Sequence, residues 1–181
     1  MLIKTLDSRF IMSFREFMVI WSGIIMISSL NQPSLVKFPE IIVMSHCHVC
    51  TRFNMMTLAA YLASHGFIVA APDHVGNTLF DDLRGEAAAV GGDFLITRGA
   101  DMQALVDVLL EGELDGMAGT VAARINPDRI GVLGHSFGAV TAGWALQNDP
   151  RIKAGVAVAA PMENPLVPGV TIANINQPTL R

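Results

Sequence analysis

The chain of 181 residues has few charges and few cysteines, and these shortages argue against several kinds of protein. Charged residues make up 15% of the sequence, and no basic stripe accompanies the formal net charge of −4. Nucleic-acid-binding domains carry clustered lysine and arginine, so no nucleic-acid partner is expected. Two cysteines are too few to define a disulfide framework. Hydrophobic residues reach 51%, which is enough for one folded domain with a sizeable core and argues against disorder.

Residues 1–37 form an apolar N-terminal segment, which we separate from a domain at residues 38–181. Three interpretations of this segment stay open: a signal or anchor, one or two early β-strands, or an aberrant start. The apolar run at residues 17–30 is short for a membrane span, and no Ala-x-Ala cleavage site follows it. Membrane contact is expected only if residues 17–30 are an anchor. The compartment is cytoplasmic, or secreted or periplasmic if residues 1–30 are a signal.

The stretch from Arg129 to Ala139 carries the clearest motif of the sequence. An apolar run at residues 130–133 leads into Gly-His-Ser-Phe-Gly, and a helical pattern follows at residues 139–146. A serine at the tip of a strand–turn–helix unit is typical of a nucleophile elbow, whose glycines let the strand and the helix pass close to the serine. The sequence therefore predicts Ser136 as a nucleophile.

The segment Ser-His-Cys-His-Val-Cys at residues 45–50 lies between an expected strand at 41–44 and an expected helix at 54–64. It allows three interpretations. Cys-x-x-Cys at a strand–helix junction suggests thiol redox chemistry or metal binding, although a zinc site would need a second cluster of ligands. A loop after an early strand also supplies the second oxyanion donor in hydrolases with this elbow. The third interpretation is a plain connection.

Asp73 and His74 follow an expected strand at residues 67–71, at the edge of an α/β sheet where active sites lie. Because the two residues are adjacent, they cannot easily relay a proton to Ser136 in line. We expect a structural role for both.

Residues 79–96 contain several glycines and are expected to be irregular, at the rim of a site. A helix with an apolar stripe is expected at residues 97–110. Asp101 and Asp107 fall outside that stripe, so both are expected to be solvated.

Taken together, these blocks resemble an α/β-hydrolase, and more narrowly the dienelactone hydrolase group that includes platelet-activating-factor acetylhydrolases and cutinase-like polyesterases. The similar stretches are residues 45–48, 58–74 and 128–139, within a region of about 38–180. The resemblance implies an α/β fold with a mostly parallel sheet and helices on both faces, incomplete at the C-terminal end. It implies no metal and no organic cofactor.

The resemblance also implies the roles of individual residues. Ser136 is the nucleophile, and the backbone N–H groups of Phe137 and His48 are the two oxyanion donors. The family has glycine where this chain has Cys47, and often a further glycine two or three residues later. If that first position needs a positive φ, Cys47 distorts the loop at a cost of roughly 1 kcal/mol or more.

A second departure concerns the catalytic triad. In this fold the order along the chain is serine, acid, histidine, yet no histidine follows Ser136. The acids after it are Asp149, in the turn after the elbow helix, and Glu163. Ala159 stands about where the nearer acid of the family belongs. A chain truncated before its acid and base explains this pattern, and an exposed sheet edge after residues 154–160 then favours self-association.

Three functions follow from these observations. The first is a serine hydrolase that cleaves small carboxylic esters or lipid esters through an acyl-serine intermediate, with activity that the missing histidine puts in doubt. The second is a non-catalytic relic or binding module with a hydrolase fold. The third is a thiol redox or metal protein built on Cys47 and Cys50, which leaves the elbow unexplained.

Overall fold

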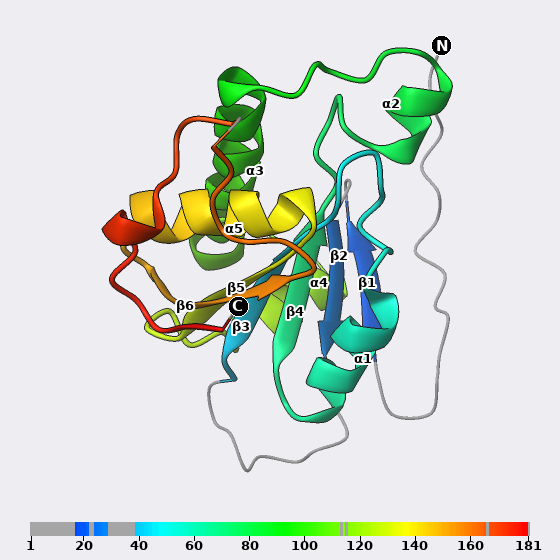
Figure 1. Ribbon diagram of the computed structural model, residues 1–181. Coiled ribbons are helices and arrows are strands. Elements are labelled where there is room, and N and C mark those ends of the chain that lie inside the picture. Colours follow the sequence, from blue (N-terminus) through cyan, green and yellow to red (C-terminus); the bar gives the residue numbers. More distant parts are fainter. Residues whose placement is uncertain are drawn as a thin grey trace.

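The computed structural model describes residues 17–21, 24–28, 39–112, 114, 116–165 and 167–180. Within these residues a seven-stranded sheet has the order β1-β2-β4-β3-β5-β6-β7 (Figure 1). The strands are β1 (Phe17–Trp21), β2 (Ile24–Ser28), β3 (Ile41–Ser45), β4 (Ile68–Pro72), β5 (Ile130–His135), β6 (Ile152–Val158) and β7 (Thr179–Leu180). Strands β4, β3, β5, β6 and β7 run parallel, whereas β1 and β2 pair antiparallel at one edge.

Helices pack on both faces of this sheet. They are α1 (Met56–Ser64), α2 (Leu79–Leu83), α3 (Gly92–Glu111), α4 (Gly116–Ala122) and α5 (Phe137–Asn148), with a 3₁₀ turn at Ile172–Asn174. Side chains from α3, α4 and α5 form one core with Val43 and Val132, and α1 packs over Met44 and Leu133 on the other face. Because the central strands are covered twice, they are almost continuous apolar runs, as parallel sheets require. The predicted α/β architecture is confirmed.

The apolar N-terminal segment contributes β1 and β2, and these strands fall where early strands were one of three interpretations. Residues 1–16, 22–23 and 29–38 lie outside the described part of the chain, and so does most of the expected signal at residues 1–30. The expected anchor at residues 17–30 falls mainly on β1 and β2. Among the described helices, none has the length and the apolar character to cross a membrane.

Two expectations about the chain are wrong. Residues 79–96 are not irregular throughout, because α2 occupies their start and α3 already begins at Gly92. A capping box between Thr78 and Asp81 starts α2, in which each side chain bonds the other residue's backbone N–H. The edge of β6 is also not fully free, since β7 pairs with Gly155 and Val156.

Helix α3 packs on α5 through a glycine. A Cβ added at Gly99 would lie 2.2 Å from the ring of Trp144, a distance that real side chains do not reach. The two helices therefore approach closely at this point, in the second half of α5.

We expect G99A to lower the free energy of unfolding by about 1–3 kcal/mol, because the new methyl group displaces the Trp144 ring. Urea denaturation provides the measurement. G92A is the matched control on the same helix, since a Cβ there would lie 3.6 Å from Pro168, an ordinary contact. Equal stability of G99A and the unmodified chain would contradict the close packing.

Candidate active site

Ser136 lies at the sharp turn between β5 and α5, in a backbone conformation that serine rarely adopts. Its φ is 54° and its ψ is −121°. The Ser136 N–H donates to the carbonyl of Val158 at 2.8 Å, and the Ser136 carbonyl accepts from Ala139 at 2.8 Å. These bonds to β6 and α5 hold the serine in a conformation that costs of order 1–3 kcal/mol. Strain of this kind is characteristic of functional turns.

The two glycines around Ser136 are required by the backbone. A Cβ at Gly134 would lie 1.9 Å from the carbonyl oxygen of Gly138, and a Cβ at Gly138 would lie 2.1 Å from the carbonyl oxygen of Ser45. No rotamer change relieves a clash with backbone. The glycines thus bring the end of β5, the first turn of α5 and the end of β3 into direct contact, as the motif predicted.

Phe137 is the first residue of α5, and no side chain caps this helix end. The first N–H groups of a helix have no acceptor within the helix, and the helix dipole adds positive potential at the same place. The N–H of Phe137, directly after the serine, is therefore well suited to bind a developing oxyanion.

The loop at residues 46–50 contains a disulfide between Cys47 and Cys50. The positive φ in this loop occurs at Val49, at 47°, and not at Cys47. The sequence predicted strain at Cys47 if that position needs a positive φ. The strained residue is instead Val49, two residues later. Among the described residues no group of three or more possible metal ligands forms.

Arg98 is the centre of the hydrogen bonds that position this loop, and its side chain is 1% exposed. It donates to Ser45 Oγ at 3.0 Å and to Thr141 Oγ1 at 3.0 Å. It also donates to the carbonyl of His46 and to Asn77 Oδ1. One guanidinium on α3 therefore joins the end of β3, the loop after it, the turn after β4 and the first turns of α5.

These bonds determine how His48 carries its proton. Arg98 can only donate, so Asn77 must turn its oxygen to Arg98 and its NH₂ group to His48. Asn77 Nδ2 lies 2.6 Å from His48 Nδ1, which accepts. A neutral His48 consequently carries its proton on Nε2, and that nitrogen is a donor rather than a base.

An aromatic wall (His48, Phe94 and Phe137) includes the residue that directly follows Ser136. The Phe94 and Phe137 rings are 5.1 Å apart, and His48 lies 5.9 Å and 6.3 Å from them. The Arg98 guanidinium packs 5.3 Å from the Phe137 ring, a cation–π contact. The rings are inclined to one another by 53° to 86°, and Phe94 is buried, so His48 and Phe137 are the more exposed members of the wall.

A second serine, histidine and aspartate are joined beneath the loop. Ser45 Oγ donates to His74 Nε2 at 2.9 Å, and His74 Nδ1 donates to Asp101 Oδ2 at 2.8 Å. Ser45 and His74 are fully buried. Asp101 is therefore not simply solvated, contrary to the sequence expectation. Asp73 pairs instead with Arg52 at 3.1 Å.

Burial keeps both histidines of this region neutral. Burial and the charge of Arg98 lower the pKa of His74 well below its usual value, and they lower the pKa of His46 to about 4. His46 Nε2 accepts from the backbone N–H of His74 at 3.0 Å, so its proton lies on Nδ1, which donates to the Cys47 carbonyl at 2.7 Å. Burial also raises the pKa of Asp101 to about 6.

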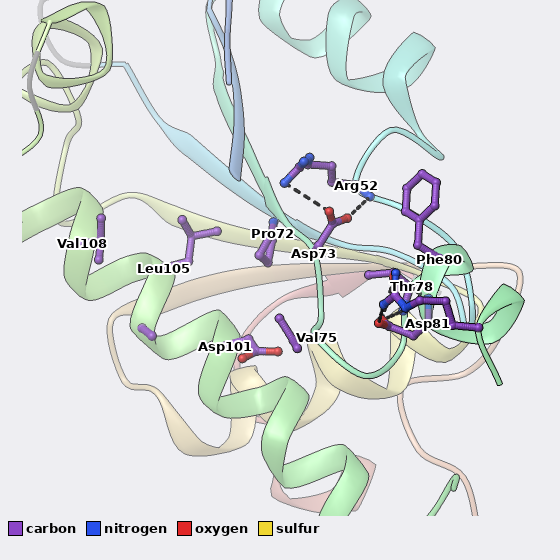
Figure 2. A pocket seen from close by; sticks show the side chains of 12 residues that line it. Arg52, Pro72, Asp73, Val75, Thr78, Phe80, Asp81, Asp101, Leu105 and Val108 are labelled. Atoms are coloured by element: carbon purple, nitrogen blue, oxygen red, sulfur yellow. Dashed lines mark hydrogen bonds and ion pairs between the residues drawn. The ribbon is translucent and has the colours of Figure 1, made fainter. Parts of the chain in front are cut away.

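A cavity of about 510 Å³ opens between α3 and the loop after β4 (Figure 2). Asp101, Leu105 and Val108 line it from α3, while Asp73 and Phe80 line it from the segment after β4. Ser136 is not among its lining residues. The cavity meets the buried hydrogen bonds at Asp101.

No side chain of the described residues forms a hydrogen bond with Ser136 Oγ. The neighbouring His135 lies 3.2 Å from Asn54 through Nδ1. The carboxylate of Asp149 pairs with Arg151 at 2.7 Å, and that of Glu163 accepts from the Ile172 N–H at 2.7 Å. The two acids that follow the elbow are therefore engaged away from it.

Sequence reasoning missed Arg98, Asn77, Ser45 and Asp101 as parts of this site. One signal was present: Arg98 lies at the spacing of the buried stripe of α3, where a charge needs partners. The identity of those partners depends on contacts between segments up to 53 residues apart, which no local pattern gives.

Comparisons with known proteins agree with the geometry. Residues 96–181 match the family described as platelet-activating factor acetylhydrolase, isoform II. Among solved structures, the chain is similar to a ferulic acid esterase from Streptomyces cinnamoneus, with 27% sequence identity and a TM-score of 0.54 over 68% of this chain. The chain spans 37% of the length of that esterase. No curated protein matches the chain.

We expect R98M to lower the free energy of unfolding by at least about 2 kcal/mol, because it leaves several buried acceptors without a donor. Urea denaturation measures the change. R129M is the control, since the Arg129 side chain is 65% exposed and its ion pair with Glu40 contributes about 0–1 kcal/mol. Similar losses in the two variants would show that Arg98 does not organise the site.

The free energy of unfolding is expected to fall as the pH is lowered from 6.5 to about 4. In this window His46 and His74 stay neutral in the folded chain but bind protons once unfolded, so unfolding takes up protons. Asp101 opposes this between pH 3.8 and about 6, because the folded state holds its proton. Where all three groups contribute, unfolding takes up two protons at the histidines and releases one at Asp101. The free energy of unfolding then falls by roughly 1.4 kcal/mol for each pH unit by which the pH is lowered.

Urea midpoints between pH 7.5 and 4.5 measure this slope, and H46N should make it shallower. A stability that stays constant or rises as the pH falls would contradict the neutral buried histidines.

Proposed function

We propose that this chain, which has an α/β-hydrolase fold and matches the platelet-activating factor acetylhydrolase isoform II family over residues 96–181, acts on carboxylic esters through Ser136. The observation that carries the proposal is the strained serine between Gly134 and Gly138, at the uncapped N-terminus of α5. Such a turn exposes a hydroxyl where backbone N–H groups are available.

In the proposed reaction the Ser136 hydroxyl attacks the ester carbonyl and forms a tetrahedral intermediate. The N–H groups of Phe137 and His48 donate to the oxyanion, and loss of the alcohol leaves an acyl-serine. Attack by water releases the acid and restores the serine. The aromatic wall would lie against the apolar part of a small ester or a lipid ester.

Removal of the Ser136 proton would proceed without a bonded side-chain base among the described residues. His48 is held as a donor, and no described side chain bonds the serine hydroxyl. An oxyanion hole and substrate binding still give measurable catalysis when a triad is broken, although several orders of magnitude are lost. We therefore propose slow acylation of Ser136 by activated esters.

The same observation favours a second candidate. A chain that keeps the elbow and the aromatic wall, but lacks a base beside Ser136, would bind an ester or a similar apolar ligand without turnover. Acylation of Ser136 separates the two candidates.

We expect a fluorophosphonate probe to label the purified chain and p-nitrophenyl acetate to be hydrolysed slowly. S136A should lose the label and fall to the uncatalysed rate, because the nucleophile is gone. S64A is the control, since Ser64 is an exposed serine at the end of α1 that bonds the Tyr61 carbonyl. Intact-mass analysis and the release of p-nitrophenol give the two readouts.

Labelling that persists in S136A would contradict the role of Ser136. A folded chain that takes up no label at all would favour the binding module instead.

A further inference from the structure

The disulfide between Cys47 and Cys50 has no part in the proposed ester chemistry, yet it closes a ring around His48 and Val49. The Cα atoms of the two cysteines are 5.2 Å apart, a normal separation for the bond. We propose that this disulfide is a thiol–disulfide exchange site whose redox state sets the conformation of the loop that carries the His48 N–H. Its effect on ester hydrolysis rests on the proposed function, whereas the exchange itself does not.

The two sulfur atoms differ in accessibility. Cys47 is 8% exposed, whereas Cys50 is only half-buried. A small thiol, as its thiolate, would therefore attack Cys50 Sγ and release Cys47 as the leaving thiolate. A second thiol then attacks the mixed disulfide and forms the oxidised small-molecule disulfide. Two thiol molecules are oxidised, and both cysteines become thiols.

The ring holds Val49 in a conformation that valine avoids. Its φ of 47° lies in the left-handed region, where a β-branched side chain is a clear outlier. When the sulfur–sulfur bond opens, Val49 can return to a negative φ. The peptide groups next to it then rotate, and the His48 N–H that the proposed reaction uses is reoriented.

Both ends of the loop stay attached after reduction. On one side the His46 carbonyl accepts from Arg98, and on the other the Cys50 carbonyl accepts from the Leu79 N–H at 2.9 Å. Neither bond involves sulfur. The change is therefore confined to residues 47–49, and the sheet and the elbow keep their structure. Reduction is therefore expected to change the loop without unfolding the chain.

The test compares the oxidised full chain with the chain reduced by a phosphine. Reduction should release two thiols per chain, and amide hydrogen exchange should accelerate in residues 47–50 while β5 and α5 keep their protection. Fluorophosphonate labelling of Ser136 should slow by at least about tenfold, since a misplaced oxyanion donor weakens acylation.

Two variants sharpen the test. C47S/C50S should show the fast loop exchange and the slow labelling in both redox conditions. V49N keeps the disulfide but places asparagine, which tolerates a positive φ, at the strained position. In glutathione buffers, half reduction of V49N should need a ratio of squared reduced to oxidised glutathione that is at least about threefold higher. The reason is that formation of the disulfide costs less when asparagine takes the positive φ.

The outcomes are distinct. Equal loop exchange in the two redox states, or loss of protection throughout the sheet on reduction, would overturn the proposal. A loop that responds to reduction in a chain that takes up no label in either state would establish the exchange site and overturn the proposed hydrolysis instead.

Discussion

The buried guanidinium of Arg98 is the constraint on which the rest of the site depends. An arginine enclosed by protein remains cationic, because even the lowered pKa of about 9 lies above neutral pH. It must therefore find acceptors, and it finds four in different segments: Ser45, the His46 carbonyl, Asn77 and Thr141. None of these segments can shift without leaving a buried donor unpaired. One buried side chain thus positions both the loop after β3 and the first turns of α5, which follow Ser136.

The same constraint explains why the loop tolerates two unusual residues. Cysteine replaces the first family glycine, and Val49 takes the positive φ. Arg98 holds one end of this loop through a backbone carbonyl, and the disulfide closes the ring that contains the strained residue. A conformation that the local sequence disfavours therefore persists, because bonds on both sides determine it. The conformational cost at Val49 is offset by the disulfide and by the hydrogen bond from Arg98, which comes from a distant helix.

The elbow could be predicted from the sequence because every requirement is local. An apolar strand, two glycines and a helix start occupy eleven consecutive residues, and the clashes at Gly134 and Gly138 show why the spacing is fixed. Helix α2 was missed because its capping box lay among glycines that suggested a loop. Asp101 was misplaced because helix periodicity gives a face, whereas its partner His74 comes from a separate strand end. The roles of Ser136, His48 and Phe137 stay predictions.

The buried hydrogen bonds from Ser45 through His74 to Asp101 show that side-chain geometry alone does not identify an active site. Judged by atom types and distances alone, this trio matches the arrangement of a serine protease better than Ser136 does. Ser45 is nevertheless fully buried, so neither solvent nor an ester can reach its hydroxyl. A template search that ignores accessibility would select this enclosed serine. Reach, rather than geometry, distinguishes a nucleophile from a structural mimic of one.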